Sequence, residues 1–274
     1  MQISAKISEK YLAAAAEIGY CGVDESFAAY TDKELIQSEE YDRKILAYYE
    51  KVKSHSLRVC QTHMSYLPSH HERMDSYEAY EAYFLPIFEK EIALTGKMEC
   101  PTTVMHPYYA DSSEESRAGN LRLIERLLPT LEAHNVILSL ENIYGAAYGE
   151  AHHSTAEDLL YYAEYFRSPY VGICLDTGHA VVRGQDPSAM LRKTAPYLTA
   201  LHAHATVPGL DLHSIPCTVG YRIQWQELAQ ILKESPYKGT FNMEIKPMSQ
   251  MSETAVVLYY QLAYRIACDL LGVE

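Results

Sequence analysis

Short apolar stretches alternate along the chain with longer segments in which apolar residues recur at helical spacing. In the clearest stretch, Val171, Ile173 and Leu175 precede a polar residue, Asp176. Such stretches predict β-strands, at residues 3–7, 21–26, 57–63, 102–106, 136–141, 171–176, 198–204 and 240–244. The intervening segments predict helices at residues 11–18, 41–53, 114–128, 155–166, 225–232 and 253–271, a long helix that includes 77–84, and a short helix after 186–187.

Eight successive strand–helix units predict a parallel sheet with helical crossovers. The fold class is therefore α/β, and eight units at this chain length predict a (β/α)8 TIM barrel. No Pro/Ser-rich linker or change of composition divides the 274 residues. We therefore expect a single barrel domain over residues 1–274.

Composition and charge make several classes of protein improbable. The longest uncharged apolar run is far below the ~20 residues that span a bilayer, and the first residues lack a signal-peptide core, so we expect a cytoplasmic protein with no membrane partner. Six cysteines without a Cys-x-x-Cys pair argue against a cysteine zinc site or a disulfide framework. The formal charge of −13 disfavours a broad nucleic-acid surface but leaves a local basic groove open.

Residues that bind metals or transfer protons end six consecutive predicted strands. They are His63, His106, Glu141, Asp176, His202 and Glu244, separated by 43, 35, 35, 26 and 42 residues. These separations match one strand–helix unit, and the C-terminal strand ends of a barrel meet at one mouth. Each residue alone could equally be a helix N-cap, a loop acceptor or a hydrogen-bonded core histidine. Buried together they need charge compensation, which a cation supplies.

Further polar residues follow these strands. His179 lies three residues after Asp176, at the start of a predicted loop, and its side chain could face the same centre. His204 shares a strand face with His202, because alternate strand residues point to the same side. The predicted long loop after this strand contains Asp211 and His213. Beside the cluster, this pair could form a second metal-binding arm or contact a substrate.

Short motifs around these residues carry a family resemblance. They are Thr-His63-Met-Ser-Tyr, Met-His106-Pro, Leu-Glu141-Asn, Leu-Asp176-Thr-Gly-His179, Leu-His202-Ala-His, Asp211-Leu-His213 and Met-Glu244-Ile-Lys. In their order and spacing they resemble the xylose-isomerase-like barrel superfamily. That superfamily includes sugar-phosphate isomerases and epimerases, ketose 3-epimerases, inosose-converting enzymes and endonuclease IV. The resemblance covers the chain from the third predicted strand onward.

The isomerase and epimerase branch implies one divalent ion held by four residues, Glu141, Asp176, His202 and Glu244. The two glutamates would act as acid and base on a sugar or sugar phosphate, through an enediolate that the ion stabilises. His179 would contact the substrate, and zinc, manganese, cobalt or iron suits the ligands.

Three other residues are expected at the substrate. Lys246 would share the strand face of Glu244 and could steady charge there, and Tyr66 and Tyr108 follow strand ends and could stack on a sugar ring. The chain departs from ketose 3-epimerases in having Pro208 where they carry Arg and Ala147 where they carry Glu. This departure argues against a ketose 3-epimerase in the strict sense.

The endonuclease IV branch is the alternative, and it implies up to three zinc ions for cleavage of abasic DNA. Nine residues match its ligands: His63, His106, Glu141, Asp176, His179, His202, Asp211, His213 and Glu244. The acidic balance and the scarcity of arginine near the predicted mouth argue against it. A third possibility is a binding or regulatory protein that keeps the ligands, although paired glutamates favour an enzyme. Tyrosine pairs on predicted helices could pack a homo-oligomer interface.

Overall fold

The computed structural model describes residues 1–27, 33–66, 74, 76–144, 153–219 and 223–273. Eight parallel strands form one sheet in the order β10–β1–β2–β3–β4–β5–β6–β7. They are β1 (Ile3–Lys6), β2 (Gly22–Ser26), β3 (Arg58–His63), β4 (Thr102–Met105), β5 (Ile137–Glu141), β6 (Val171–Asp176), β7 (Leu198–His202) and β10 (Phe241–Met243). Directly after β7, Ala203 donates its backbone N–H to the carbonyl of Asn242 in β10 at 2.8 Å. The sheet is thus a nearly closed barrel, which confirms the predicted α/β TIM-barrel fold.

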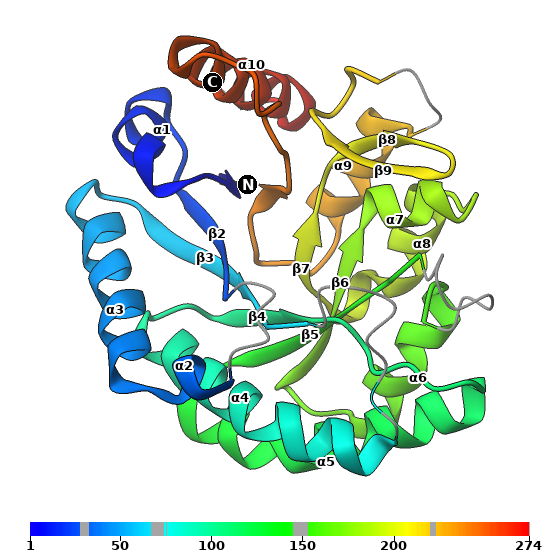
Figure 1. Ribbon diagram of the computed structural model, residues 1–274. Helices are drawn as coiled ribbons and strands as arrows, with labels where there is room; N and C mark the ends of the chain where they lie inside the picture. Colours follow the sequence, from blue (N-terminus) through cyan, green and yellow to red (C-terminus); the bar gives the residue numbers. More distant parts are fainter. Residues whose placement is uncertain (28–32, 67–73, 75, 145–152, 220–222, 274) are drawn as a thin grey trace.

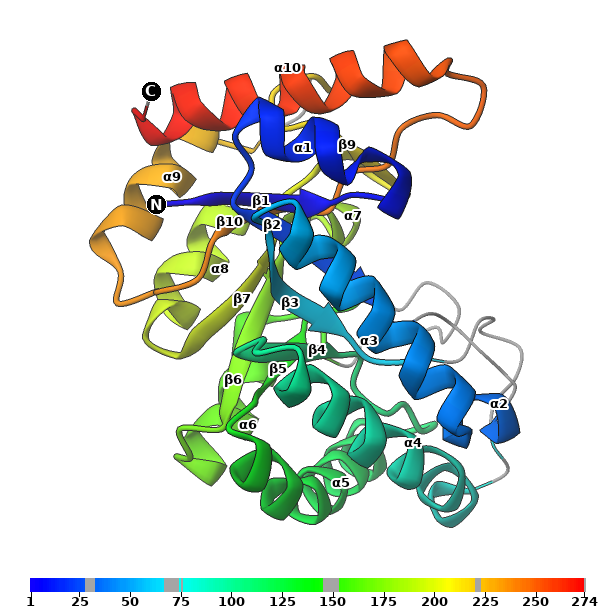
Figure 2. The same ribbon diagram turned by 90° about the vertical axis from the view of Figure 1, so that its left-hand side faces the viewer.

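Helices surround the strands (Figure 1). They are α1 (Leu12–Ile18), α2 (Lys33–Gln37), α3 (Glu39–Ser54), α4 (Tyr77–Lys97), α5 (Ser113–His134), α6 (Ala156–Phe166), α7 (Thr177–Val182), α8 (Pro187–Thr194), α9 (Trp225–Glu234) and α10 (Glu253–Leu271), with 3-10 turns at Glu9–Tyr11 and Ala195–Tyr197. Figure 2 shows α1 beside α10, so the two ends of the chain pack together. Within the described ranges, no helix combines the length and the apolar character that a bilayer span requires.

A serine caps the N-terminus of each of four helices. Ser38, Ser76, Ser112 and Ser252 stand immediately before α3, α4, α5 and α10, and each side chain accepts a backbone N–H from the first turn. Such caps satisfy amide groups that have no partner within the helix. These serine caps fix the residue at which each of the four helices begins, and so the residue at which the preceding loop ends.

The barrel interior contains a polar layer in addition to the apolar core around it. Ser139 bonds to Thr102 and to Thr199, each at 2.6 Å, and thereby connects β4, β5 and β7. Ser4 in β1 donates to Asn242 Oδ1 in β10 at 2.8 Å. These bonds join residues far apart in sequence, because the strands that carry them meet inside the barrel. They form a rigid base beneath the mouth.

The structure corrects the predicted end of the seventh strand. β7 ends at His202, and the chain then forms an antiparallel hairpin of β8 (Ala205–Val207) and β9 (Leu210–Ser214), where a loop was predicted. The chain leaves the barrel here because the Thr177 hydroxyl accepts the backbone N–H of His204 at 3.0 Å. Strand alternation therefore does not relate His202 to His204.

A helix also replaces the loop predicted after β6. The Asp176 carboxylate accepts the backbone N–H of His179 at 2.6 Å, which makes Asp176 the N-cap of α7. One aspartate thus ends a strand, starts a helix and still presents its second oxygen to the barrel mouth. His179 lies in the first turn of this helix, close to the strand ends.

Candidate metal centre

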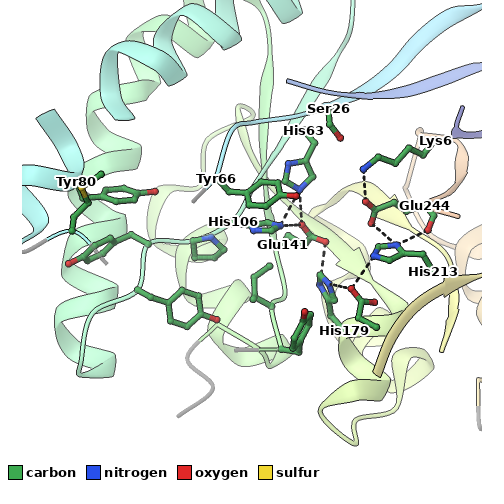
Figure 3. A pocket seen from close by; sticks show the side chains of 17 residues that line it. Lys6, Ser26, His63, Tyr66, Tyr80, His106, Glu141, His179, His213 and Glu244 are labelled. Carbon is green, nitrogen blue, oxygen red and sulfur yellow. Dashed lines mark hydrogen bonds and ion pairs between the residues drawn. The ribbon is translucent and has the colours of Figure 1, made fainter. Parts of the chain in front are cut away.

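Glu141 occupies the centre of the barrel mouth (Figure 3). Its Oε1 lies 2.8 Å from Nδ1 of His202. Its Oε2 lies 3.2 Å from Nε2 of His63 and 3.1 Å from Nε2 of His106. His63 ends β3 and His106 directly follows β4, so three neighbouring strands bring these groups together. One carboxylate thereby connects two clusters of potential ligands.

Four of the predicted residues form one compact group. Glu141, Asp176, His202 and Glu244 each offer one oxygen or nitrogen within 4.8 Å of the others, and all four are buried. His202 Nδ1 lies 3.2 Å from Glu244 Oε2 and 3.7 Å from Asp176 Oδ2. The side chain of Asn142 holds Asp176 in place through two bonds to its backbone, of 2.8 and 2.9 Å. This arrangement can hold one divalent cation.

The β8–β9 hairpin carries a second set of polar side chains to the mouth. His213 Nε2 lies 3.0 Å from Asp211 Oδ2, and His204 Nε2 lies 3.7 Å from Asp211 Oδ1. The rings of His204 and His213 stack with centroids 4.4 Å apart. His179 reaches the same aspartate, with Nε2 3.6 Å from Oδ2. His204, Asp211 and His213 form a three-residue group that could hold an ion, and His204 is not among the nine residues that the resemblance gives.

Burial and mutual attraction control the charges of these groups. Burial opposes ionisation of Glu141 and Glu244. Attraction to His202, with hydrogen bonding to His106 in the case of Glu141 and attraction to Lys6 in the case of Glu244, keeps the pKa of both carboxyls below the ordinary range. Burial likewise opposes a charge on His179, yet Asp176 and Asp211 raise the pKa of its imidazole to about 10. Buried carboxylates therefore require positive charge nearby.

A divalent cation fits this requirement. In its absence protonated imidazoles compensate the carboxylates, whereas a bound ion would supply the charge and leave the imidazoles neutral as ligands. The donor set mixes imidazole nitrogen with carboxylate oxygen, as zinc and other first-row transition metals accept.

Lys6 is a cation of the site that the sequence analysis missed. It ends β1, and its Nζ lies 3.1 Å from Glu244 Oε1. Burial opposes its charge, but Glu244 and Asp24 outweigh burial and raise its pKa. The predicted cation, Lys246, is exposed and does not line the pocket, because β10 ends before Glu244 and strand alternation no longer applies. The available signal was the position of Lys6 near the end of the first predicted strand, 3–7.

A pocket opens beside the charged groups, and five tyrosines also line it; Figure 3 shows Tyr66 next to His106 and Tyr80 further from the charged groups. The five tyrosines are Tyr66, Tyr80, Tyr108, Tyr109 and Tyr144. Tyr66 stacks on His106 with ring centroids 4.6 Å apart, and Tyr144 meets the His179 ring at 4.9 Å. The structure thus places Tyr66 and Tyr108 in the pocket wall, and their contact with a substrate stays a prediction.

An eight-stranded barrel with buried imidazoles and carboxylates at its strand ends defines a TIM-barrel protein with a candidate metal centre. A family model described as xylose isomerase-like TIM barrel matches residues 12–260. The chain therefore belongs to the xylose isomerase-like TIM barrel family, which confirms the resemblance seen in the sequence.

Individual proteins resemble the chain more distantly. "Uncharacterized protein y4fM" of Sinorhizobium fredii is 27% identical over 197 residues, which cover 67% of this chain and 59% of that protein. "Probable endonuclease 4" of Thermoplasma volcanium is 28% identical over 145 residues, which cover 53% of this chain and 48% of that protein. The chain thus matches between about half and three fifths of the length of these relatives.

Solved structures share the fold over the whole chain. D-psicose 3-epimerase, crystallised in the presence of D-fructose, matches with a TM-score of 0.79 at 15% identity and covers 99% of this chain and 100% of its own. The 3-keto-D-glucoside 4-epimerase of E. coli matches with a TM-score of 0.74 at 14% identity, with coverage of 98% and 100%. At these identities the likeness establishes the barrel architecture.

Proposed function

We propose that the protein is a metal-dependent isomerase or epimerase that acts on a sugar or sugar phosphate. The observation that carries this proposal is the buried group of Glu141, Asp176, His202 and Glu244, with one potential ligand atom from each within 4.8 Å of the others. The group would hold one divalent ion, for which zinc, manganese, cobalt and iron are all chemically suitable. Sugar epimerases with the same barrel fold support the substrate class.

The four residues divide into two pairs by their access to the pocket. Glu141 and Glu244 line it, whereas Asp176 and His202 are buried beneath it. When bound, the ion polarises the substrate's oxygens and stabilises the negative charge that develops when a proton leaves the adjacent carbon. One glutamate would remove that proton and the other would return one to the same or the neighbouring carbon.

Neighbouring groups prepare these glutamates and hold the substrate. Lys6, 3.1 Å from Glu244, favours the ionised carboxylate that a general base requires. His179 lines the pocket from the first turn of α7 and would bind a sugar oxygen. The rings of Tyr66 and Tyr108 present apolar faces on which a sugar ring can pack while hydroxyls remain free to hydrogen-bond.

The test combines metal analysis with turnover. We expect one ion per chain by elemental analysis and activity on at least one member of a panel of aldoses, ketoses and their phosphates. Glu141→Gln and Glu244→Gln should each reduce turnover by about 10²-fold or more, because each removes an acid–base group. Glu157→Gln, on the exposed surface of α6, is the matched control and should retain activity. A fully active Glu244→Gln enzyme would refute the proton-transfer role.

A second candidate function is a multi-zinc phosphodiesterase acting on abasic DNA. The observation that favours it is two further groups that could hold ions, His63–His106–Glu141 and His204–Asp211–His213. Two or three zinc ions per chain, reduced in a His63→Ala, His213→Ala double variant, together with cleavage of abasic-site DNA, would establish this function. One ion per chain, unchanged in the double variant, favours the isomerase or epimerase.

A further inference from the structure

Asp24 in β2 lies behind His202, on the side away from the four-residue group. His202 directs Nδ1 toward Glu141, while its Nε2 lies 3.7 Å from Oδ2 of Asp24. The two side chains are only 1% and 2% exposed. Among the described residues, neither His202 Nε2 nor Asp24 Oδ1 has a hydrogen-bond partner. An unpartnered buried imidazole nitrogen beside a buried carboxylate calls for an explanation, because unpartnered buried polar atoms are rare in folded proteins.

Two amides hold the Asp24 carboxylate in position. Gln61 in β3 donates to Oδ2 at 3.1 Å, and Asn242 in β10 donates to the same oxygen at 3.0 Å. The hydroxyl of Ser4 donates to Oδ1 of Asn242 at 2.8 Å, which fixes the orientation of that amide. Three strands thus hold a carboxylate behind an imidazole that faces the metal centre.

If His202 binds a metal ion, Asp24 can act as the hydrogen-bond acceptor for its ring. A neutral imidazole that binds an ion through Nδ1 carries its proton on Nε2. This buried N–H needs an acceptor, and Asp24 is the charged acceptor beside it. A shift of about 0.5 Å would bring the 3.7 Å separation into hydrogen-bond range. The bond would give His202 Nε2 the partner that it lacks.

We infer that Asp24 is a positioning residue that acts through His202. It accepts the Nε2–H, selects the tautomer with a free Nδ1, fixes the ring and makes the imidazole a stronger ligand. Carboxylate partners of metal-bound histidines typically change metal affinity by 10–100-fold. This inference rests on the metal centre of the proposed function, but it concerns affinity for the ion and is independent of which sugar reacts.

The experiment measures the Zn²⁺ dissociation constant of the purified full-length protein by competition with a chromophoric chelator. Asp24→Asn keeps the shape of the side chain and removes its charge, and we expect it to bind Zn²⁺ about 10–100-fold more weakly. Asp158→Asn, which alters a helix-capping aspartate of α6 outside the site, is the control and should bind as the wild type does. Thermal unfolding of the zinc-free proteins separates affinity from folding, since a merely structural role would lower Tm without changing the dissociation constant.

A second measurement needs no variant. In the ¹⁵N-labelled, zinc-loaded wild type, NMR should show a proton on Nε2 of His202 that exchanges slowly with water. Its absence, or an unchanged Zn²⁺ dissociation constant in Asp24→Asn, would overturn the role of Asp24 and leave the proposed function intact. A wild-type protein that binds none of Zn²⁺, Mn²⁺, Co²⁺ and Fe²⁺ would overturn the inference together with the proposed metal centre.

Discussion

Glu91 is a buried carboxyl whose titration should contribute to the pH dependence of stability. It lies in α4, fully buried, and accepts the backbone N–H of Ser65 at 3.0 Å as well as the Ser65 hydroxyl. Burial raises the pKa of this carboxyl from 4.5 to about 8, and the bonds from Ser65 only partly oppose the rise. Glu91 therefore carries a proton in the folded protein at pH 7. It supports the segment between His63 and Tyr66, on the wall of the pocket.

The sign and size of the effect follow from this shift. Because the folded pKa lies above the unfolded value, the contribution to stability is complete below about pH 4.5 and is lost as the pH rises through about 8. Between these values each pH unit changes the free energy of unfolding by about 1.4 kcal/mol. Glu91 should therefore reduce the free energy of unfolding by roughly 4 kcal/mol between pH 5 and pH 8.

Urea denaturation of the wild type and Glu91→Gln at pH 5, 6, 7 and 8 measures this contribution. Glutamine keeps an acceptor oxygen for Ser65 but does not titrate, so its stability relative to the wild type should improve steadily with pH. Subtracting the two proteins cancels the titration of all other groups that the substitution leaves unchanged. Glu50→Gln, at an exposed position of α3, should show a small and constant difference. A constant difference for Glu91→Gln would refute the reasoning.

Two other substitutions test the mouth of the barrel. A Cβ on Gly178 would lie 1.9 Å from Cε1 of His204. Gly178→Ala should therefore displace that ring and lower the free energy of unfolding by about 1–3 kcal/mol, measured by urea denaturation. Unchanged stability would contradict this packing. Lys6→Met removes the cation next to Glu244 and should raise the pKa of that carboxyl, which shifts the acidic limb of the kcat/KM profile to higher pH. An unshifted profile would show that Lys6 does not influence the base.

The sequence was sufficient to predict the barrel and most of the chemically reactive residues that meet at its mouth. Most strands contain a recognisable apolar stretch, and a barrel brings the strand ends together regardless of the loops between them. His63, Glu141, Asp176, His202 and Glu244 therefore converge as predicted. Their exact partners depend on side-chain geometry, which the spacing of residues along the chain does not contain.

Three features could not be predicted, for related reasons. The hairpin that carries Asp211 begins where the backbone N–H of His204 donates to the Thr177 hydroxyl, a hydrogen bond between residues 27 positions apart. Lys246 was expected at the site because the alternation of the predicted strand, 240–244, was extended two residues past its end, whereas β10 already ends at Met243. Asp24 is followed directly by Glu25. A register shift after Val23 affects which of these two carboxylates points into the barrel interior.

The distribution of the ligands along the chain has a consequence for assembly. Of the candidate ligands, His63 ends β3 and Glu244 directly follows β10, and the others lie on or next to the strands and the hairpin between them. A nascent chain therefore cannot complete the centre until its last strand has joined the sheet. A chain cut between β5 and β6 would separate Glu141 from Asp176. If such a pair of fragments binds the ion, the two fragments have associated into one barrel.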